Sequence, residues 1–486
     1  TLIISYVGYK TQNIKVAGRN SFKIVLVEDA EILDEVVVVG YGVQKKSSVT
    51  GAISSVKAED FENRTITNAE QALQGKTAGV QIISASAAPG SNPAIRIRGY
   101  SSNASSDPLY VVDGLRTKDI SNLDPNDIES MEVLKDAASA AIYGAQSGAG
   151  GVVLVTTKKA KQGAPSLTYD GTFGIRQATN LIEPLNAEQQ IEMRKISHQN
   201  AGLSLPVGWD VTKNPWIGTT RTDWMDEIFR TAVSTNHQLT ISNGSDKAKS
   251  LFSLGYTNNQ GTQIHSFFKQ YSVRANTEYS LIKDRLKVGE NLAISYLQYK
   301  SQWETFLAMI MPPMVPVYDV NGNWAGPAGL DDFDNPVRKM TMGKDNINNY
   351  VKIIGNVFAD LNIWNGISAR TQFGINYGNS YSRTVDGAYV ETGFRGNDKN
   401  YVRNNQSHPL NYVWTNTLSY NKSFGKHHID AVFGSEFTRY VQEGFYASRE
   451  GLYLEDRDFA GLSVATGDEI DVSSSADEYT YFSLFA

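Results

Sequence analysis

The sequence predicts a mainly β protein in three parts: the end of a small β-sandwich, a mixed α+β domain, and the first part of an antiparallel transmembrane β-barrel. From residue 167 onward, apolar and polar residues alternate in segments of about ten residues, with aromatic residues near the segment ends, as in membrane barrels. The composition, with 25 Tyr, 41 Gly and a mean hydropathy of −0.33, fits a barrel that alternates lipid-facing and lumen-facing residues. A soluble β-sandwich is the alternative, and it favours strands of about five or six residues.

The overall composition excludes several classes of function. The 486 residues carry a net charge of −6, which argues against a nucleic-acid partner, because such a partner normally requires a basic surface. The absence of cysteine excludes disulfides, thiol catalysis and cysteine-ligated metals. No run of about 18 apolar residues is present, so the sequence predicts no transmembrane helix.

Residues 1–29 predict the last strands of a small antiparallel β-sandwich, at 2–6, 11–16 and 22–27. The sequence starts within the first of these strands without a signal peptide, and it stops within another at Ala486. We therefore expect a fragment of a longer protein at both ends.

The segment 30–44 contains a short and strongly β-prone run. Two acidic residues precede four valines, and glycines follow them, in the order Asp34, Glu35, Val36, Val37, Val38, Val39. Such a segment is suited to adding itself as a strand to the sheet edge of another protein. An ordinary buried strand of a neighbouring domain is the alternative that local composition leaves open.

Residues 45–163 predict the α+β domain. Asn68 and Asp136 are candidate caps of two short helices, one from 69 that ends at Gly75 or Gly79 and one at 137–143. Strands are predicted around the helices at 80–83, 94–98, 109–112, 128–134 and 151–157.

Residues 164–486 predict the barrel strands. Asn365-Gly366 is a favoured hairpin dipeptide and predicts a tight turn between two of them. Long polar excursions are predicted as outer loops at 178–230, 300–348, 380–410 and 443–476. Tryptophans in these loops, such as Trp209 and Trp303, are suited either to stacking on sugar rings or to packing within the loops.

The chain lacks the sequence motifs of common enzymes. Gly75-Lys76-Thr77 imitates the end of a phosphate-binding loop, but Glu70 stands where that loop requires its first glycine. Neither H-E-x-x-H nor G-x-S-x-G occurs. We therefore expect neither catalytic residues nor a cofactor or metal.

Six motifs in the α+β domain resemble, in the same order, the plug domain of SusC/RagA-type TonB-dependent outer-membrane transporters. They comprise Ala72–Ile82, Pro89-Gly90, Ile95–Gly99, Pro108–Gly114, Asp127–Asp136, and the closing pair Ala140–Gly144 with Gly151–Lys159. The resemblance covers residues 1–165 closely, and the remainder agrees in type with the start of a barrel.

This resemblance implies a function and its partners. Residues 1–29 would be the end of a carboxypeptidase-regulatory-like domain, and the valine run at 36–39 would be the TonB box in the periplasm. The barrel of this family has 22 strands, of which this chain would supply 8 to 12. Such a transporter lies in outer-membrane lipid of a Gram-negative cell and imports a large nutrient, typically an oligosaccharide, beneath a SusD-like lipoprotein. TonB, energised through ExbB and ExbD, pulls on the box to open the plug.

The resemblance also suggests residues that hold the plug inside the barrel. Arg96 and Arg98 are predicted to lie on one face of a strand, where plug arginines of this superfamily pair with barrel acids. Glu129 and Glu132 are further candidates, as partners of these arginines within the plug. A solvated strand face is the alternative for the two arginines.

Other functions remain open from the sequence. A peptide importer of the same type differs only in its substrate. A siderophore or cobalamin receptor would not need the extra N-terminal domain, and a signalling receptor would transport little. A soluble adhesin-like β-protein is the alternative from another class.

Overall fold

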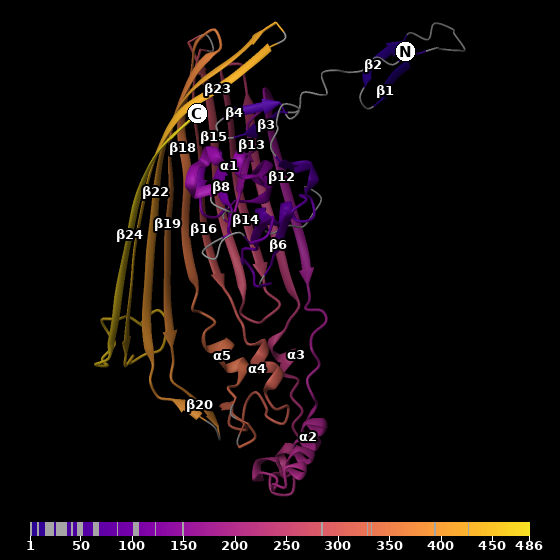
Figure 1. Cartoon of the computed structure of the whole chain (residues 1–486). Helices are drawn as coiled ribbons and strands as arrows, with labels where there is room; N and C mark the ends of the chain where they lie inside the picture. Colours follow the sequence, from indigo (N-terminus) through magenta and orange to yellow (C-terminus); the bar gives the residue numbers. More distant parts are fainter. Residues whose placement is uncertain are drawn as a thin grey trace.

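The computed structural model describes residues 2–6, 9–14, 24–25, 36–39, 42–45, 52–61, 68–84, 86–100, 106–121, 123–147, 150–282, 285–327, 329–331, 333–392, 395–425 and 427–486. These residues form a large antiparallel sheet, an α+β domain on one side of that sheet, and two short strand pairs near the N-terminus (Figure 1). No helix among them is long and apolar enough to cross a membrane.

Ten strands of the described chain form the large sheet, and each pairs antiparallel with the next of these ten along the chain. They are β12 (Gly163–Arg176), β13 (Ala232–Gly244), β14 (Ala248–Gln260), β15 (Phe267–Leu281), β16 (Leu286–Lys300), β18 (Asn348–Trp364), β19 (Ile367–Asp386), β22 (Tyr401–Phe424), β23 (His427–Glu450) and β24 (Ile470–Phe485). The number lies within the expected 8 to 12, although the strands are longer than predicted, with 13 to 24 residues each. Asn365 and Gly366 form the predicted hairpin turn, with φ angles of 44° and 90°.

On the two faces of this sheet, the burial of apolar and polar residues is the reverse of that in a soluble protein. Leu167 and Phe173 on the outer face are 68% and 69% exposed. Polar residues on the inner face are buried, including Gln238, Arg274 and Lys352 at 1–3% exposure. A soluble β-sandwich would bury the apolar face, so that alternative is wrong, and the outer face is suited to lipid.

A row of aromatic rings crosses the outer face of five adjacent strands, from β12 to β16. Its members are Tyr169, His237, Tyr256, Tyr271 and Tyr296, with successive ring centroids 5.1–6.4 Å apart. Tyr169 Oη also lies 2.7 Å from His237 Nδ1. Aromatic rows of this kind mark the level at which a membrane barrel meets the lipid headgroups.

Long loops gather at one end of the sheet, and tight turns lie at the other, near the N-terminus (Figure 1). The loops carry helices α2 (Ala187–Asn200), α3 (Trp224–Ile228), α4 (Thr305–Ile310) and α5 (Pro336–Met342), the single-turn 3₁₀ segments 207–209 and 215–218, and strands β17 (Trp324–Ala325), β20 (Tyr389–Thr392) and β21 (Arg395–Asn397). The last two predicted loops are shorter than expected, because β19, β22 and β23 extend into them. Trp209 is buried in an apolar cluster of the loops, whereas Trp303 is 65% exposed.

The α+β domain contains a five-stranded sheet in the order β5-β10-β11-β8-β9, in which only β8 and β11 pair in parallel. Its strands are β5 (Ile53–Lys57), β8 (Leu109–Val112), β9 (Leu115–Thr117), β10 (Ile128–Leu134) and β11 (Val152–Thr157), beside a separate pair, β6 (Val80–Ile83) and β7 (Ala94–Ile97). Both predicted helices are present, as the 3₁₀ turn 69–73 and as α1 (Ala137–Ala140) continued by a 3₁₀ segment to residue 147. Further 3₁₀ turns lie at 58–60 and 125–127.

Two strand pairs lie near the N-terminus. One joins β1 (Leu2–Tyr6) and β2 (Tyr9–Ile14), and Ile24 and Val25 of the predicted third strand are not in a strand. The other joins the valine run, β3 (Val36–Val39), to β4 (Gly42–Lys45). Asp34 and Glu35 lie outside the described residues.

Candidate functional site

The α+β domain meets the inner face of the large sheet through a polar contact surface, here called the inner interface. It comprises residues 113–121, 123–127 and Lys158 of the domain and the wall residues that face them. Four ion pairs between described residues cross it: Arg116 Nε to Glu436 Oε1 at 2.7 Å, Lys352 Nζ to Asp119 Oδ1 at 2.6 Å, and two from Arg274, Nη1 to Asp127 Oδ1 at 3.8 Å and Nη2 to Asp113 Oδ2 at 4.0 Å. In each pair, one partner belongs to the domain and the other to a wall strand.

Arg274 on β15 forms the centre of the first group of contacts. Its guanidinium donates to the backbone carbonyls of Asp127 at 2.8 Å and Lys158 at 3.3 Å. The Asp127 carboxylate in turn accepts hydrogen bonds from Gln238 at 2.6 Å and Ser253 at 3.0 Å. These bonds satisfy the buried charges, which would otherwise be costly to remove from water.

Asp124 caps the 3₁₀ turn that presents Asp127. Its carboxylate accepts from the backbone of Asn126 at 2.9 Å and from Asn236 of the wall at 3.1 Å. Burial raises the pKa of Asp124 to about 6, and the nearby Asp127 charge adds to the rise.

The second group of contacts surrounds Arg116 on β9 and Glu436 on β23. Their side chains are only 7% and 2% exposed. Thr415 donates to the second oxygen of Glu436 at 3.1 Å, and the Arg116 guanidinium lies 5.7 Å from the ring centre of Tyr143. This pair is therefore closed off from water on both sides of the interface.

The third group joins Lys352 on β18 to Asp119. The Lys352 side chain is 2% exposed, and its ammonium also donates to the Asp119 carbonyl at 3.3 Å. Burial opposes ionisation of Asp119, but the Lys352 charge and nearby hydrogen bonds outweigh it and lower the pKa of this carboxyl.

A tight turn at Asp113-Gly114 fits the domain against the wall. Both residues have positive φ angles, 47° and 83°. The Asp113 carbonyl accepts from Asn356 at 3.4 Å and from Gln372 at 3.2 Å. A Cβ on Gly114 would lie 3.0 Å from the Gln372 amide, so both the conformation and the close approach favour glycine.

The predicted arginine contacts need correction. Strand β7 ends at Ile97, and Arg98 follows it with φ 57°, so the prediction that both arginines lie on one face of a strand is wrong. Arg96 forms its ion pair with Asp107 of the same domain rather than with the wall. Arg98 is exposed, and its backbone amide donates to Gly79 at 2.8 Å. A plug–barrel contact by Arg98 remains a prediction.

The predicted glutamate contacts also lie within the domain. Glu129 is 3.8 Å from Lys161, and Glu132 accepts from Ser55 at 3.5 Å. Neither glutamate pairs with Arg96, which forms its ion pair with Asp107. The sequence does contain a signal for the wall residues that form ion pairs across the interface. Arg274, Lys352 and Glu436 are charged residues at lumen-facing positions of alternating strands.

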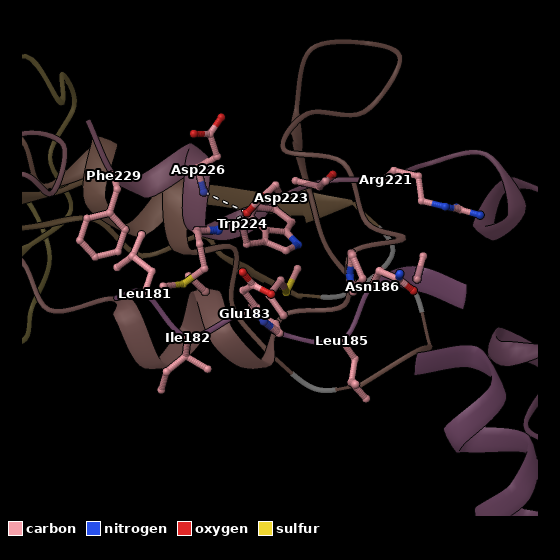
Figure 2. Close-up of a pocket in the computed structure, with 17 residues that line it drawn as sticks. Leu181, Ile182, Glu183, Leu185, Asn186, Arg221, Asp223, Trp224, Asp226 and Phe229 are labelled. Atoms are coloured by element: carbon pink, nitrogen blue, oxygen red, sulfur yellow. Dashed lines mark hydrogen bonds between the residues drawn. The ribbon is translucent and has the colours of Figure 1, made fainter. Parts of the chain in front are cut away.

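Two of the hollows that the described residues line are relevant here. One, of about 130 Å³, lies on the inner interface beside Asp119 and Lys352. The other, of about 430 Å³, lies among the loops, where Figure 2 shows Leu181, Ile182 and Leu185 along one side and Trp224 within it. In the part of the chain that the structure describes, no group of three His, Asp or Glu side chains is arranged to hold a metal ion.

Glu70 lies in the buried 3₁₀ turn 69–73 of the α+β domain and provides a pH-dependent test of that burial. The residue is 2% exposed, and burial raises its pKa to about 7; Asp119 adds to the rise and Lys352 opposes it. The folded state holds this proton more tightly than the unfolded state, so Glu70 should cost stability as pH rises from about 4.5 to 7. Glu70→Gln should therefore stabilise the domain at pH 8, by on the order of 3 kcal/mol, and much less at pH 4.5. Thermal melting of the two forms at both pH values measures the difference, and an equal shift at both values would contradict the assignment.

Comparison with known proteins shows which class and which family this chain resembles. A model of the TonB-dependent Receptor Plug Domain matches residues 45–152. An α+β domain held against the inner face of a large antiparallel sheet is the arrangement of TonB-dependent receptors, a class of transporters and receptors rather than enzymes. Within this class, the chain is similar to receptors of the SusC/RagA type.

The individual similarities extend over most of the chain. It is 32% identical to the TonB-dependent receptor SusC of Bacteroides thetaiotaomicron, over 91% of this chain and 46% of that protein. It is 33% identical to the TonB-dependent receptor P3 of Formosa agariphila, over 95% of this chain and 45% of that protein. The RagAB peptide importer in its open-open state superposes with a TM-score of 0.76 and 27% identity, over 93% of this chain and 54% of the other. The chain thus spans about half the length of the relatives that it matches.

Proposed function

We propose that the protein containing this chain imports a large nutrient, an oligosaccharide, across the outer membrane by a TonB-dependent mechanism. The observation that carries this proposal is the plug seated on the barrel wall by buried ion pairs, since an obstruction held in this way must move before a large solute can pass. The oligosaccharide assignment is supported by the resemblance to transporters that typically import such molecules. It is also supported by tyrosines facing the lumen, such as Tyr350, Tyr440 and Tyr479, because aromatic faces suit sugar rings.

The proposal includes two protein partners and an energy source. TonB, driven through ExbB and ExbD, would bind the box at 34–39 by pairing with a strand and would pull the plug. A SusD-like lipoprotein would cover the loop end. Exposed apolar side chains there support a protein contact, since Ile182 is 60% exposed and Met193 on α2 is 57% exposed. The loops would face outward, and residues 1–44 would lie in the periplasm.

A peptide is the second candidate nutrient. The similarity to the RagAB peptide importer favours it, because that structure matches most of this chain at 27% identity. The transport mechanism would be the same for both substrates, so only the nutrient distinguishes the two proposals.

An uptake experiment tests the function. Cells that produce the complete protein should accumulate fluorescent oligosaccharides of six or more residues. This uptake should fall to background when the proton gradient is collapsed or TonB is deleted, while binding at the cell surface persists. Uptake of labelled peptides alone would establish the second candidate, and uptake that is indifferent to TonB would contradict the mechanism.

A further inference from the structure

Four successive rows of side chains cross the outer face of β14, β15 and β16, and the register between these strands defines them. From the turns toward the loops, the rows are Leu254–Val273–Ile294, Tyr256–Tyr271–Tyr296, Asn258–Lys269–Gln298 and Gln260–Phe267–Lys300. The first row is apolar and exposed, the second belongs to the aromatic row, and the last two are polar except for Phe267. The outer face thus changes from apolar to polar at the tyrosines, on the side where the loops begin (Figure 1).

The hydroxyl of Tyr296 marks this boundary. It donates to Asn349 of β18 at 2.8 Å and accepts from Gln298 at 3.0 Å. Gln298 lies in the next row toward the loops, and Asn349 is its partner across β16 and β18. The tyrosine therefore keeps its ring beside the apolar row and its hydroxyl among amides, as aromatic residues do at the depth of lipid headgroups.

Two lysines lie on the loop side of this boundary. Lys269 pairs with Gln298, and Lys300 pairs with Phe267, so the two lysines are diagonal neighbours on one face of the sheet. Lys269 Nζ lies 5.4 Å from the ring centre of Phe267. A Cβ on Gly343 would lie 3.4 Å from Lys300 Nζ, so this ammonium extends past the strand end toward the loops. Long basic side chains commonly extend in this way from apolar surface to the polar side of a membrane interface.

The surface around these lysines has an excess of positive charge. In β13, β14, β15, β16 and β18, which the structure describes throughout, no Asp or Glu occupies an outward position on the loop side of the tyrosines. The charge of Asp345, which precedes β18, acts on Lys300, but the adjacent Lys344 balances it. Basic groups at headgroup depth attract the phosphates of anionic lipids.

We propose that Lys269, Phe267 and Lys300 form a binding site for a phosphorylated lipid of the outer leaflet. The two ammonium groups hold a phosphate of the headgroup, and the acyl chains lie along the exposed apolar row next to the tyrosines. The inference rests on the proposed function for its orientation, in which the loops face outward. The site lies on the opposite face of the sheet from the plug, so this binding requires neither TonB nor a nutrient.

Native mass spectrometry of the complete, delipidated protein in detergent tests the binding. The probes are lipid A with two phosphates and the same lipid with both phosphates removed, and inorganic phosphate serves as a competitor. The phosphorylated lipid should bind at least about tenfold more tightly than the dephosphorylated lipid. Inorganic phosphate should not displace it, because free phosphate lacks the acyl chains that contact the apolar row.

Three variants identify the groups responsible. Lys269→Gln/Lys300→Gln should lose most of the preference for the phosphorylated lipid, since each lysine near a membrane surface contributes roughly fivefold. Lys269→Arg/Lys300→Arg keeps both charges and should retain the preference. Lys422→Gln is the matched control, because Lys422 lies on the outer face near the tight turns, 5.1 Å from the ring centre of Phe424. Its affinity should equal that of the wild type.

Each contrary outcome has a distinct meaning. Equal binding of the two lipids, or a preference that the double glutamine variant retains in a barrel shown to be folded by heat-modifiable migration on gels, would overturn the site. Displacement by inorganic phosphate would overturn the assignment to a lipid. A dimer whose abundance depends on the two lysines would assign this surface to a second copy of the protein instead. Uptake that fails while lipid binding persists would count against the proposed function alone.

Discussion

Glu436→Ala is expected to loosen the plug from the barrel wall by about 3–5 kcal/mol, because it leaves the buried Arg116 charge without its partner. Neither side chain of the pair exceeds 7% exposure, so water cannot readily replace the lost carboxylate. The effect can be measured in planar bilayers, as a fall in the urea concentration at which passive conductance through the complete protein rises.

Two controls separate burial from charge in this prediction. Glu478→Ala breaks the exposed pair with Arg439, whose side chains are 49% and 54% exposed, and should cost about 1 kcal/mol or less. The double variant Arg116→Met/Glu436→Leu removes both buried charges and should recover most of the stability, since apolar replacements of buried pairs are often neutral. An unchanged urea midpoint in Glu436→Ala would show that the pair does not hold the plug.

Val37→Pro is expected to abolish energised uptake while leaving nutrient binding intact. Val37 lies in the middle of β3, and proline would remove a backbone donor from any strand pair that the valine run forms. A strand added to a sheet of TonB relies on such main-chain bonds for its affinity. Uptake and surface binding measured on the same cells separate the two effects.

Val37→Ile is the matched control, because it keeps the backbone donor and the strong preference for a strand. Its uptake should equal that of the wild type. Loss of binding and of outer-membrane assembly together in Val37→Pro would instead indicate that the run is a core strand of a domain. That outcome would restore the alternative which local composition leaves open.

The architecture could be predicted from the sequence because the local residue patterns agree with the global fold. Alternation along β15 and β18 sets which side chains face lipid, and a turn dipeptide at Asn365-Gly366 sets the register between two long strands. The ends of the last loops were misjudged, since β22 continues through polar residues such as Asn404 and Asn405. Pairing with neighbouring strands determines the structure there, rather than the preferences of the residues themselves.

The contacts of the plug were harder to predict. Arg96 and Arg98 stand in a motif of the plug, but motifs do not reveal where a strand ends or which sheet it joins. The interface depends on pairs separated by more than 100 residues, such as Arg274 with Asp127 and Lys352 with Asp119. The alternation of apolar and polar residues along β18 identifies Lys352 as facing the lumen, yet only the three-dimensional arrangement identifies its partner.

The central claim is that the plug is attached to the wall at Asp119–Lys352 and must move away from it during import. The most direct measurement joins Asp119→Cys to Lys352→Cys with a short cleavable bis-thiol crosslinker, in a chain that has no other cysteine among its 486 residues. We expect cells that carry the crosslinked protein to bind the oligosaccharide but not to accumulate it. Cleavage of the crosslink should restore uptake. Single-cysteine variants treated in the same way should transport throughout. Undiminished uptake by the fully crosslinked protein would contradict the claim.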